Sequence, residues 1–284
     1  MTKIQASWPV AVMLALPVRQ TAQVISAASG AATVSAGSIV SIYGHGFASA
    51  AECATTIPLP LELGGVSARF LETNILNMPA FIEAMPLFYV SPTQINAQIP
   101  ADVSFLPCNM GSGSVFYTYI EITTPSGTQK IPTNTTGAPA PGLFTANETG
   151  TGVAAAQFVT NLPDGTQTIT NVAECPGGVG ACVPLLLNVR AGTSALVLWG
   201  TGISEYATFP AGATVMAGSQ PLEVFYAGAS PQYVGLDQIN VWLPASLAGS
   251  GVLNLSVMLS GYSSQLGPNC SFQVTSNAVT IDIQ

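Results

Sequence analysis

The sequence contains two copies of one ordered set of motifs, and this internal repeat constrains the fold more than any other feature. The first copy has Ala36-Gly-Ser-Ile-Val-Ser-Ile-Tyr-Gly-His-Gly-Phe47 and, further on, Leu87-Phe-Tyr-Val-Ser-Pro-Thr-Gln-Ile-Asn-Ala-Gln-Ile-Pro100. The second copy has Ala191-Gly-Thr-Ser-Ala-Leu-Val-Leu-Trp-Gly-Thr-Gly-Ile203 and then Asp237-Gln-Ile-Asn-Val-Trp-Leu-Pro244. Because the motifs keep their order, we predict two similar folding units of somewhat over 100 residues.

Strand-like segments rich in β-branched and aromatic residues recur in both copies. They span residues 38–43, 115–122, 195–199, 253–259 and 278–283. Clusters of Gly, Pro, Asn and Ser separate these segments and are typical of turns. The sequence therefore predicts an all-β fold, with short helical turns only near residues 77–85 and 244–247.

Seven or so short strands per copy are typical of an immunoglobulin-like β-sandwich. We predict two tandem sandwiches, residues 24–139 and 140–284, joined by the proline-rich segment 137–142. Proline density there favours a stiff, extended connection between the two units.

Charged residues are scarce, and this scarcity excludes several classes of partner. Five Lys and Arg residues and thirteen Asp and Glu residues amount to 6% of the chain, with a net charge of −8. So few basic residues cannot neutralise a run of phosphates, which argues against nucleic acid and anionic membranes as partners. They are also too few to form the polar faces of ordinary amphipathic helices.

Several of the motifs together resemble a known family. These are the repeated segments above, Ala140-Pro-Gly-Leu-Phe144, Gly152-Val-Ala-Ala-Ala-Gln157 and the ending Ser276-Asn-Ala-Val-Thr-Ile-Asp-Ile283. They resemble the uncharacterised C-terminal domain family expanded in Solibacter and other Acidobacteria, which is similar to IPT/TIG immunoglobulin-like domains. The resemblance covers residues 24–284 and implies a secreted bacterial protein, without an established activity.

Five cysteines and a single histidine point to disulfides and not to metal binding. No CxxC spacing occurs, and His45 alone cannot make a two-histidine zinc site. The Gly- and Pro-rich loop between Cys175 and Cys182 can reverse the chain, so this pair is the first expected disulfide. Cys53 with Cys108 is the second, and Cys270 is left free or pairs between chains.

The N-terminal segment allows two interpretations. Residues 10–16 form an apolar run that is too short to span a bilayer. Residues 1–23 are either a secretory signal peptide or a retained strand. In the second case, we expect Val10, Val12, Leu14 and Leu16 to pair with the open sheet edge of a neighbouring subunit.

Catalytic residues are not evident in the sequence. His45 lies in a Gly-His-Gly turn, but the matching residue of the second copy is Thr201, which is more typical of a structural turn position. No Gly-x-Ser-x-Gly nucleophile motif accompanies it. We therefore expect neither catalytic residues, nor a cofactor, nor a bound metal.

A ligand surface is the last candidate feature. Gln94, Asn96, Gln238, Asn240 and Trp242 place amides and an aromatic ring on the repeated strands, as in some sugar-binding faces. A simpler interpretation is that Ile95 and Ile239 face the core while the amides bond to nearby loops.

Taken together, these features predict a secreted, noncatalytic structural protein at the cell surface that associates with itself or with other surface components. The nearly uncharged surface favours strand pairing between subunits. An extracellular polysaccharide-binding module is the alternative.

Overall fold

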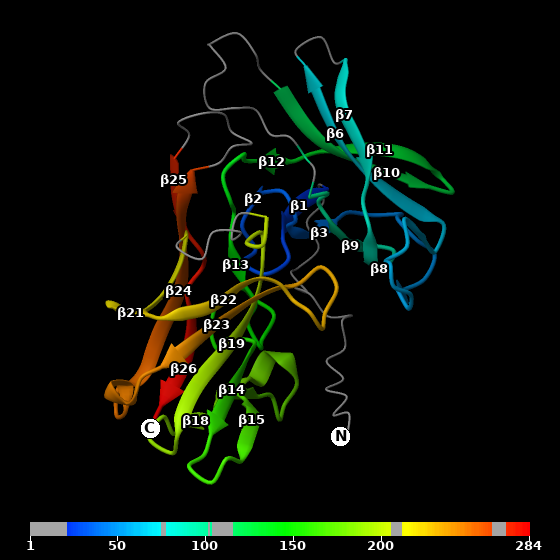
Figure 1. Ribbon diagram of the computed structural model, residues 1–284. Helices are drawn as coiled ribbons and strands as arrows, with labels where there is room; N and C mark the ends of the chain where they lie inside the picture. Colours follow the sequence, from blue (N-terminus) through cyan, green and yellow to red (C-terminus); the bar gives the residue numbers. More distant parts are fainter. Residues whose placement is uncertain (1–21, 75–77, 102, 104–115, 206–211, 263–270) are drawn as a thin grey trace.

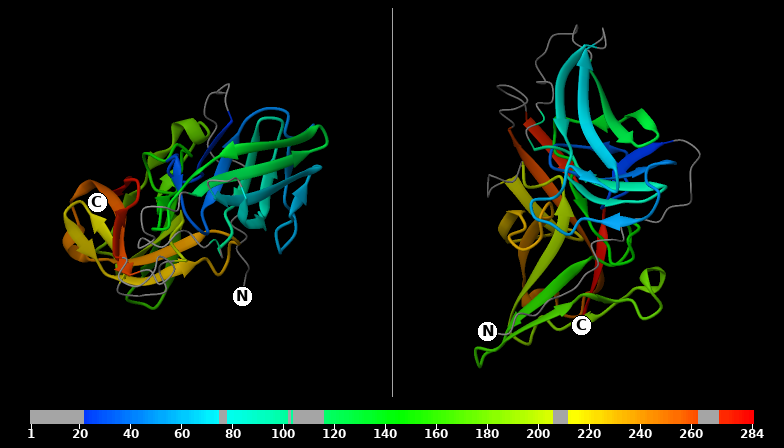
Figure 2. Two further views of the ribbon diagram at one scale, coloured as in Figure 1. Left: turned by 90° about the horizontal axis from the view of Figure 1, so that it is seen from above. Right: turned by 90° about the vertical axis from the view of Figure 1, so that its right-hand side faces the viewer.

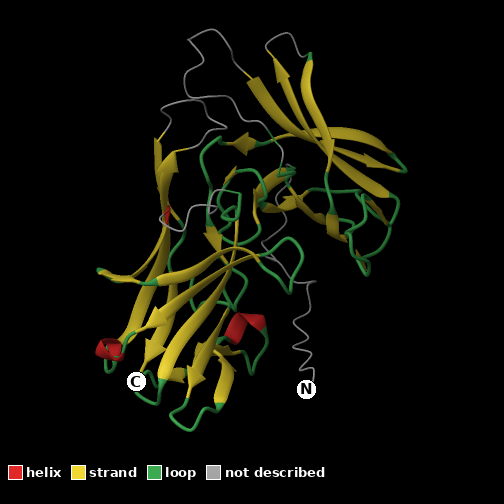
Figure 3. Ribbon diagram, viewed as in Figure 1, coloured by secondary structure: helices red, strands yellow, loops and turns green. Residues whose placement is uncertain are grey.

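The computed structural model confirms an all-β sandwich fold, and among the described residues Val179–Ala181 and Ala245–Leu247 form short 3-10 turns (Figure 1, Figure 3). The structure describes residues 22–74, 78–101, 103, 116–205, 212–262 and 271–284. Within these ranges no helix is long and apolar enough to cross a membrane.

The strands of the first half of the chain form two main sheets, named here by one central strand each. The β3 sheet has the order β1 (Gln23–Ser26), β3 (Ile39–Tyr43), β9 (Gln94–Gln98), β8 (Leu87–Val90) and β4 (Glu52–Cys53). The β10 sheet has the order β11 (Gly127–Pro132), β10 (Phe116–Thr124), β6 (Val66–Asn74) and β5 (Glu62–Leu63), and β7 (Pro79–Ala84) also pairs with β6. A short parallel pair joins β2 (Thr33–Val34) to β12 (Asn134–Thr135).

The second half repeats this arrangement. The β19 sheet has the order β15 (Gln167–Asn171), β14 (Ala156–Asn161), β19 (Thr193–Thr201), β23 (Asp237–Leu243) and β22 (Val224–Ala229), and β13 (Gly142–Leu143) also pairs with β19. The β24 sheet has the order β18 (Leu186–Leu187), β26 (Val279–Ile283), β24 (Gly251–Tyr262), β20 (Ala213–Ala217) and β21 (Gln220–Leu222), and β25 (Ser271–Thr275) also pairs with β24. A two-stranded ribbon joins β16 (Ala173–Glu174) to β17 (Val183–Pro184).

Each half has its own apolar core. Val40, Ile42 and Ile95 of the β3 sheet pack with Phe70 and Ile120 of the β10 sheet. The β19 and β24 sheets enclose a second core in the same way. Successive residues of a strand point to opposite faces, which is why alternate residues of β23 are buried and partly exposed. The assignment of the two halves as immunoglobulin-like domains remains a prediction.

The two copies of the repeated strand occupy equivalent places, as the sequence predicted. Tyr43 pairs with Gln94 in the first half, and Trp199 pairs with Gln238 in the second. The next pair on the same face is Ser41 with Asn96, and its counterpart is Val197 with Asn240.

The Gly-x-Gly turn after this strand is also the same in both halves. Its second glycine has a positive φ, 70° at Gly46 and 71° at Gly202, a conformation that other residues rarely adopt. The first glycine lies under an apolar side chain three residues later. A Cβ at Gly44 would collide with Phe47, and one at Gly200 would lie 2.7 Å from Ile203 Cδ1.

The two halves lie side by side and pack directly on one another (Figure 2). Ile39 and Phe88, on the outer face of the β3 sheet, form an apolar cluster with Phe144 and Leu236 of the second half. The two halves approach each other so closely that a Cβ at Gly235 would lie 2.5 Å from Phe88 Cζ. This contact places loops from both halves around one opening.

Three further expectations concern residues that the structure describes. Residues Pro79–Ala84 form strand β7, so the helical turn expected there is wrong, because antiparallel pairing with β6 satisfies this backbone instead. The turn at Ala245–Leu247 is confirmed. So is the disulfide between Cys175 and Cys182, whose Cα atoms are 3.9 Å apart.

The second expected disulfide is wrong for Cys53, which is an exposed free cysteine on β4. Spacing along the chain could not show whether a partner thiol comes within reach of β4. Cys108, Cys270 and the expected assembly strand Val10, Val12, Leu14 and Leu16 lie outside the described residues.

Candidate functional site

The outer face of the β19 sheet carries several aromatic and amide side chains. Ile239, Val241 and Leu243 of β23 point into the core, so the residues between them point outward. The outward residues of this sheet, which we call the aromatic–amide face, include Gln157, Trp199, Phe225, Tyr226, Gln238, Asn240 and Trp242.

Aromatic rings stand at both ends of this face. Phe225 stacks on Trp242, with ring centroids 4.4 Å apart and an interplanar angle of 26°. At the other end Trp199 meets Tyr233 edge to face, with centroids 5.2 Å apart. Gln238 lies opposite Trp199, and Trp242 follows four residues later on β23. The two ends of the face are therefore separated by about 13 Å along the strand.

Amides lie between the two ends. Gln238 Nε2 donates to Asn240 Oδ1 at 3.0 Å, and Gln238 Oε1 accepts from Ser230 Oγ at 3.3 Å. These contacts hold the two side chains in position. They leave Asn240 Nδ2 without a partner among the described residues, so it can donate to a ligand.

The first half has the same amide pair, but in a closed setting. Gln94 Nε2 donates to Asn96 Oδ1 at 2.9 Å, yet Asn96 is fully buried. The predicted ligand surface is therefore wrong for Asn96, since a ligand cannot reach it. Ile95 and Ile239 face the cores, as the simpler interpretation expected, and Gln238 bonds both to Asn240 and to Ser230 of a nearby loop.

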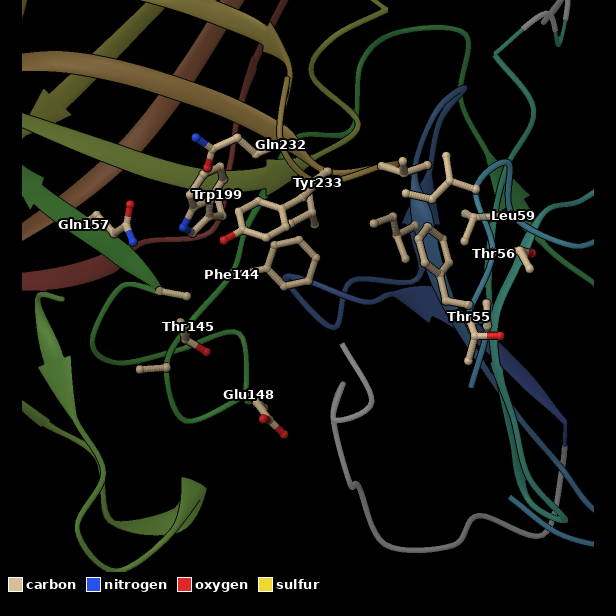
Figure 4. A pocket seen from close by; sticks show the side chains of 18 residues that line it. Thr55, Thr56, Leu59, Phe144, Thr145, Glu148, Gln157, Trp199, Gln232 and Tyr233 are labelled. Carbon is tan, nitrogen blue, oxygen red and sulfur yellow. The ribbon is translucent and has the colours of Figure 1, made fainter. Parts of the chain in front are cut away.

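A pocket of about 370 Å³ adjoins the Trp199 end of this face, between the two halves. Figure 4 shows Trp199, Tyr233 and Phe144 on one side and Leu59, Thr55 and Thr56 on the other. The lining residues are Ile39, Ala54, Thr55, Thr56, Ile57, Leu59, Phe88, Phe144, Thr145, Ala146, Glu148, Ala155, Gln157, Trp199, Gln232, Tyr233, Val234 and Leu236.

Glu148 supplies the only carboxyl among these lining residues, and none of them is Lys or Arg. Its φ of 59° is the only positive value at a non-glycine residue in the described part of the chain. The turn is held by Thr145, whose Oγ1 accepts from the N–H groups of Thr149 and Gly150 at 3.2 and 3.1 Å. Burial raises the pKa of the Glu148 carboxyl to about 7. Backbone strain and a shifted pKa together are typical of functional sites.

The structure also shows where the one histidine lies. His45 is exposed on its turn, whereas its counterpart Thr201 is buried. Over the residues that the structure describes, no group of three or more His, Cys, Asp or Glu side chains could hold a metal ion.

The pocket was not predicted from the sequence. Its rings come from motifs that looked purely structural, since Trp199 ends a repeated strand and Phe144 ends the Ala140-to-Phe144 motif. Neither family models nor curated proteins match the chain.

Proposed function

We propose that this chain is a secreted, noncatalytic protein that binds an extracellular polysaccharide on the aromatic–amide face. The observation that carries the proposal is that Trp242, Asn240, Gln238 and Trp199 lie, partly exposed, on the outer face of one sheet. Aromatic rings stack on the apolar faces of sugar rings, and amides bond to their hydroxyl groups. A disulfide and the absence of a membrane-spanning helix among the described residues are compatible with secretion.

Binding to insoluble and soluble polysaccharides tests this function, by pull-down and by affinity electrophoresis. Trp242→Ala should weaken binding about tenfold or more, because it removes a stacking ring. Tyr117→Ala is the matched control, since Tyr117 is 49% exposed on β10 of the first half, away from the face. Equal binding by both variants, with unchanged melting temperatures, would contradict the proposal.

Self-association is a second candidate, and strand β15 favours it. This strand lies at the edge of the β19 sheet, and all five of its residues are exposed and uncharged. Edge strands of monomeric proteins usually carry charges or prolines that prevent pairing with another chain. We propose that β15 pairs with a strand of a second subunit in a structural assembly at the cell surface.

Replacement of Ile169, which is 55% exposed on β15, tests this candidate. Ile169→Lys should lower the mass of the assembly in light scattering or native mass spectrometry. Val252→Lys adds the same charge at a residue that is 62% exposed on β24, which is not an edge strand. A purely monomeric wild-type protein would rule out this second function and leave polysaccharide binding unaffected.

A further inference from the structure

The pocket between the two halves differs in chemistry from the aromatic–amide face. Side chains that line it are mainly apolar, with Ile39, Leu59 and Phe88 from the first half and Phe144 and Leu236 from the second. Its volume of about 370 Å³ lies in the range of small-molecule sites. An apolar body of the size of a substituted benzene ring fits such a space.

Charge narrows the class of ligand. With a carboxyl and no Lys or Arg among the lining residues, the pocket disfavours phosphates and carboxylates. Trp199 and Tyr233 present aromatic rings beside the same opening (Figure 4). Aromatic faces attract cations, and a nearby carboxylate adds to that attraction.

The backbone of the turn that carries Glu148 is held by hydrogen bonds. Thr145 holds the turn through two backbone N–H groups, and the Glu148 backbone itself donates to the carbonyl of Thr145 at 3.0 Å. A Cβ at Gly150 would lie 2.6 Å from the carbonyl oxygen of Ser29, so the turn also rests on the first half. Because the backbone of this turn is already ordered, ligand binding needs to order only the Glu148 side chain.

We infer that the pocket binds a small organic cation with an apolar body, such as an aryl-alkyl ammonium, with Glu148 as the counter-ion and Trp199 and Tyr233 as the aromatic wall. This site adjoins the aromatic–amide face and shares Trp199 and Gln157 with it, but its carboxyl, Glu148, is not part of that face. It requires both halves of the chain, because neither half alone supplies all of its walls.

Binding of the cation should depend on pH. Because the pKa of Glu148 is about 7, the carboxyl is mostly neutral at pH 6 and mostly ionised at pH 8. Only the ionised form attracts the cation, so affinity should rise roughly tenfold between these values. Tyr233 is the other titratable side chain of the lining.

The test compares benzyltrimethylammonium with its uncharged isostere neopentylbenzene, by NMR titration of the full chain. At pH 8 the wild type should bind the cation at least tenfold more tightly than the isostere. Glu148→Gln should reduce this difference and remove the pH dependence, while Tyr233→Ala should weaken the binding of both ligands.

A second neutral variant shows whether misfolding of Glu148→Gln accounts for its effect. Asn adopts positive φ more readily than most residues, so Glu148→Asn should keep the turn and behave as Glu148→Gln does. Equal affinity of the wild type for the two ligands, no binding of either, or an unchanged preference in both Glu148 variants would overturn the inference.

Discussion

The backbone N–H of Ile39 donates a hydrogen bond to Thr201 Oγ1 at 2.7 Å, and both residues are fully buried. Ile39 begins the repeated strand of the first half, and Thr201 lies in the Gly-x-Gly turn of the second. His45 and Thr201 occupy the same position of the repeated turn. His45 is exposed, whereas Thr201 links the two halves.

Thr201→Val should destabilise the protein by about 1 to 3 kcal/mol, because it leaves the N–H of Ile39 buried without an acceptor. Thermal or urea unfolding measures the change. His45→Val is the matched control at the equivalent, exposed position and should leave stability unchanged. Equal effects of the two substitutions would mean that the bond does not contribute to stability.

Local patterns allowed many of the strands to be predicted. β-Branched and aromatic residues marked the segments 38–43 and 195–199 as strands, and the repeated Gly-x-Gly sequence marked their ends. Both signals depend on neighbouring residues alone. The strand β7 was not predicted in this way, because its conformation depends on pairing with β6.

The pocket could not be predicted in the same way. Its walls include the segment 54–59 and the loop 232–236, which the fold brings together from distant parts of the chain. Which outer face stays open also depends on tertiary packing. Asn96 and Asn240 occupy matching positions of one motif, yet only Asn96 is fully buried.

The cysteines should differ in reactivity. In the native protein an alkylating reagent should modify Cys53, which is exposed and free, but should spare Cys175 and Cys182 until a reductant is added. Mass spectrometry of digests prepared with and without reductant measures this. The double variant Cys175→Ser, Cys182→Ser should lose about 2 to 3 kcal/mol at most, because the disulfide closes a short loop. Alkylation of Cys182 without reductant would contradict the disulfide.

Ile42→Asp should unfold the first half or cost several kcal/mol, because it buries an unpaired charge in a tightly packed core. Circular dichroism and thermal unfolding detect the loss. Ile169→Asp makes the same change at a strand residue that is 55% exposed, and it should be tolerated. If the two variants melt alike, the register assigned to β3 is wrong.

Stability should fall as the pH rises from about 4 to 6, and Asp237 is the main reason. This carboxyl is almost fully buried, and it accepts a hydrogen bond from the N–H of Ile203 at 2.7 Å. Burial raises its pKa from 3.8 to about 6, against the opposing effect of hydrogen bonds from Ser204 and Ile203.

A raised folded-state pKa means that the folded protein holds its proton more tightly than the unfolded chain does. The resulting stabilisation is complete below the unfolded value of 3.8 and is lost as the pH rises through about 6. The difference between the two pKa values of Asp237 corresponds to roughly 3 kcal/mol of stability as an upper limit. Burial also raises the pKa values of Glu72 and Glu148, which act in the same direction.

Urea unfolding at pH 4, 6 and 8 measures this dependence, with Asp237→Asn as the comparison. Asparagine keeps an oxygen that accepts the N–H of Ile203 but carries no charge at any pH. The variant should therefore match the wild type near pH 4 and exceed it in stability at pH 8. A wild type that is more stable at pH 8 than at pH 4, or a variant with the same pH dependence, would show that Asp237 is not held in its protonated form.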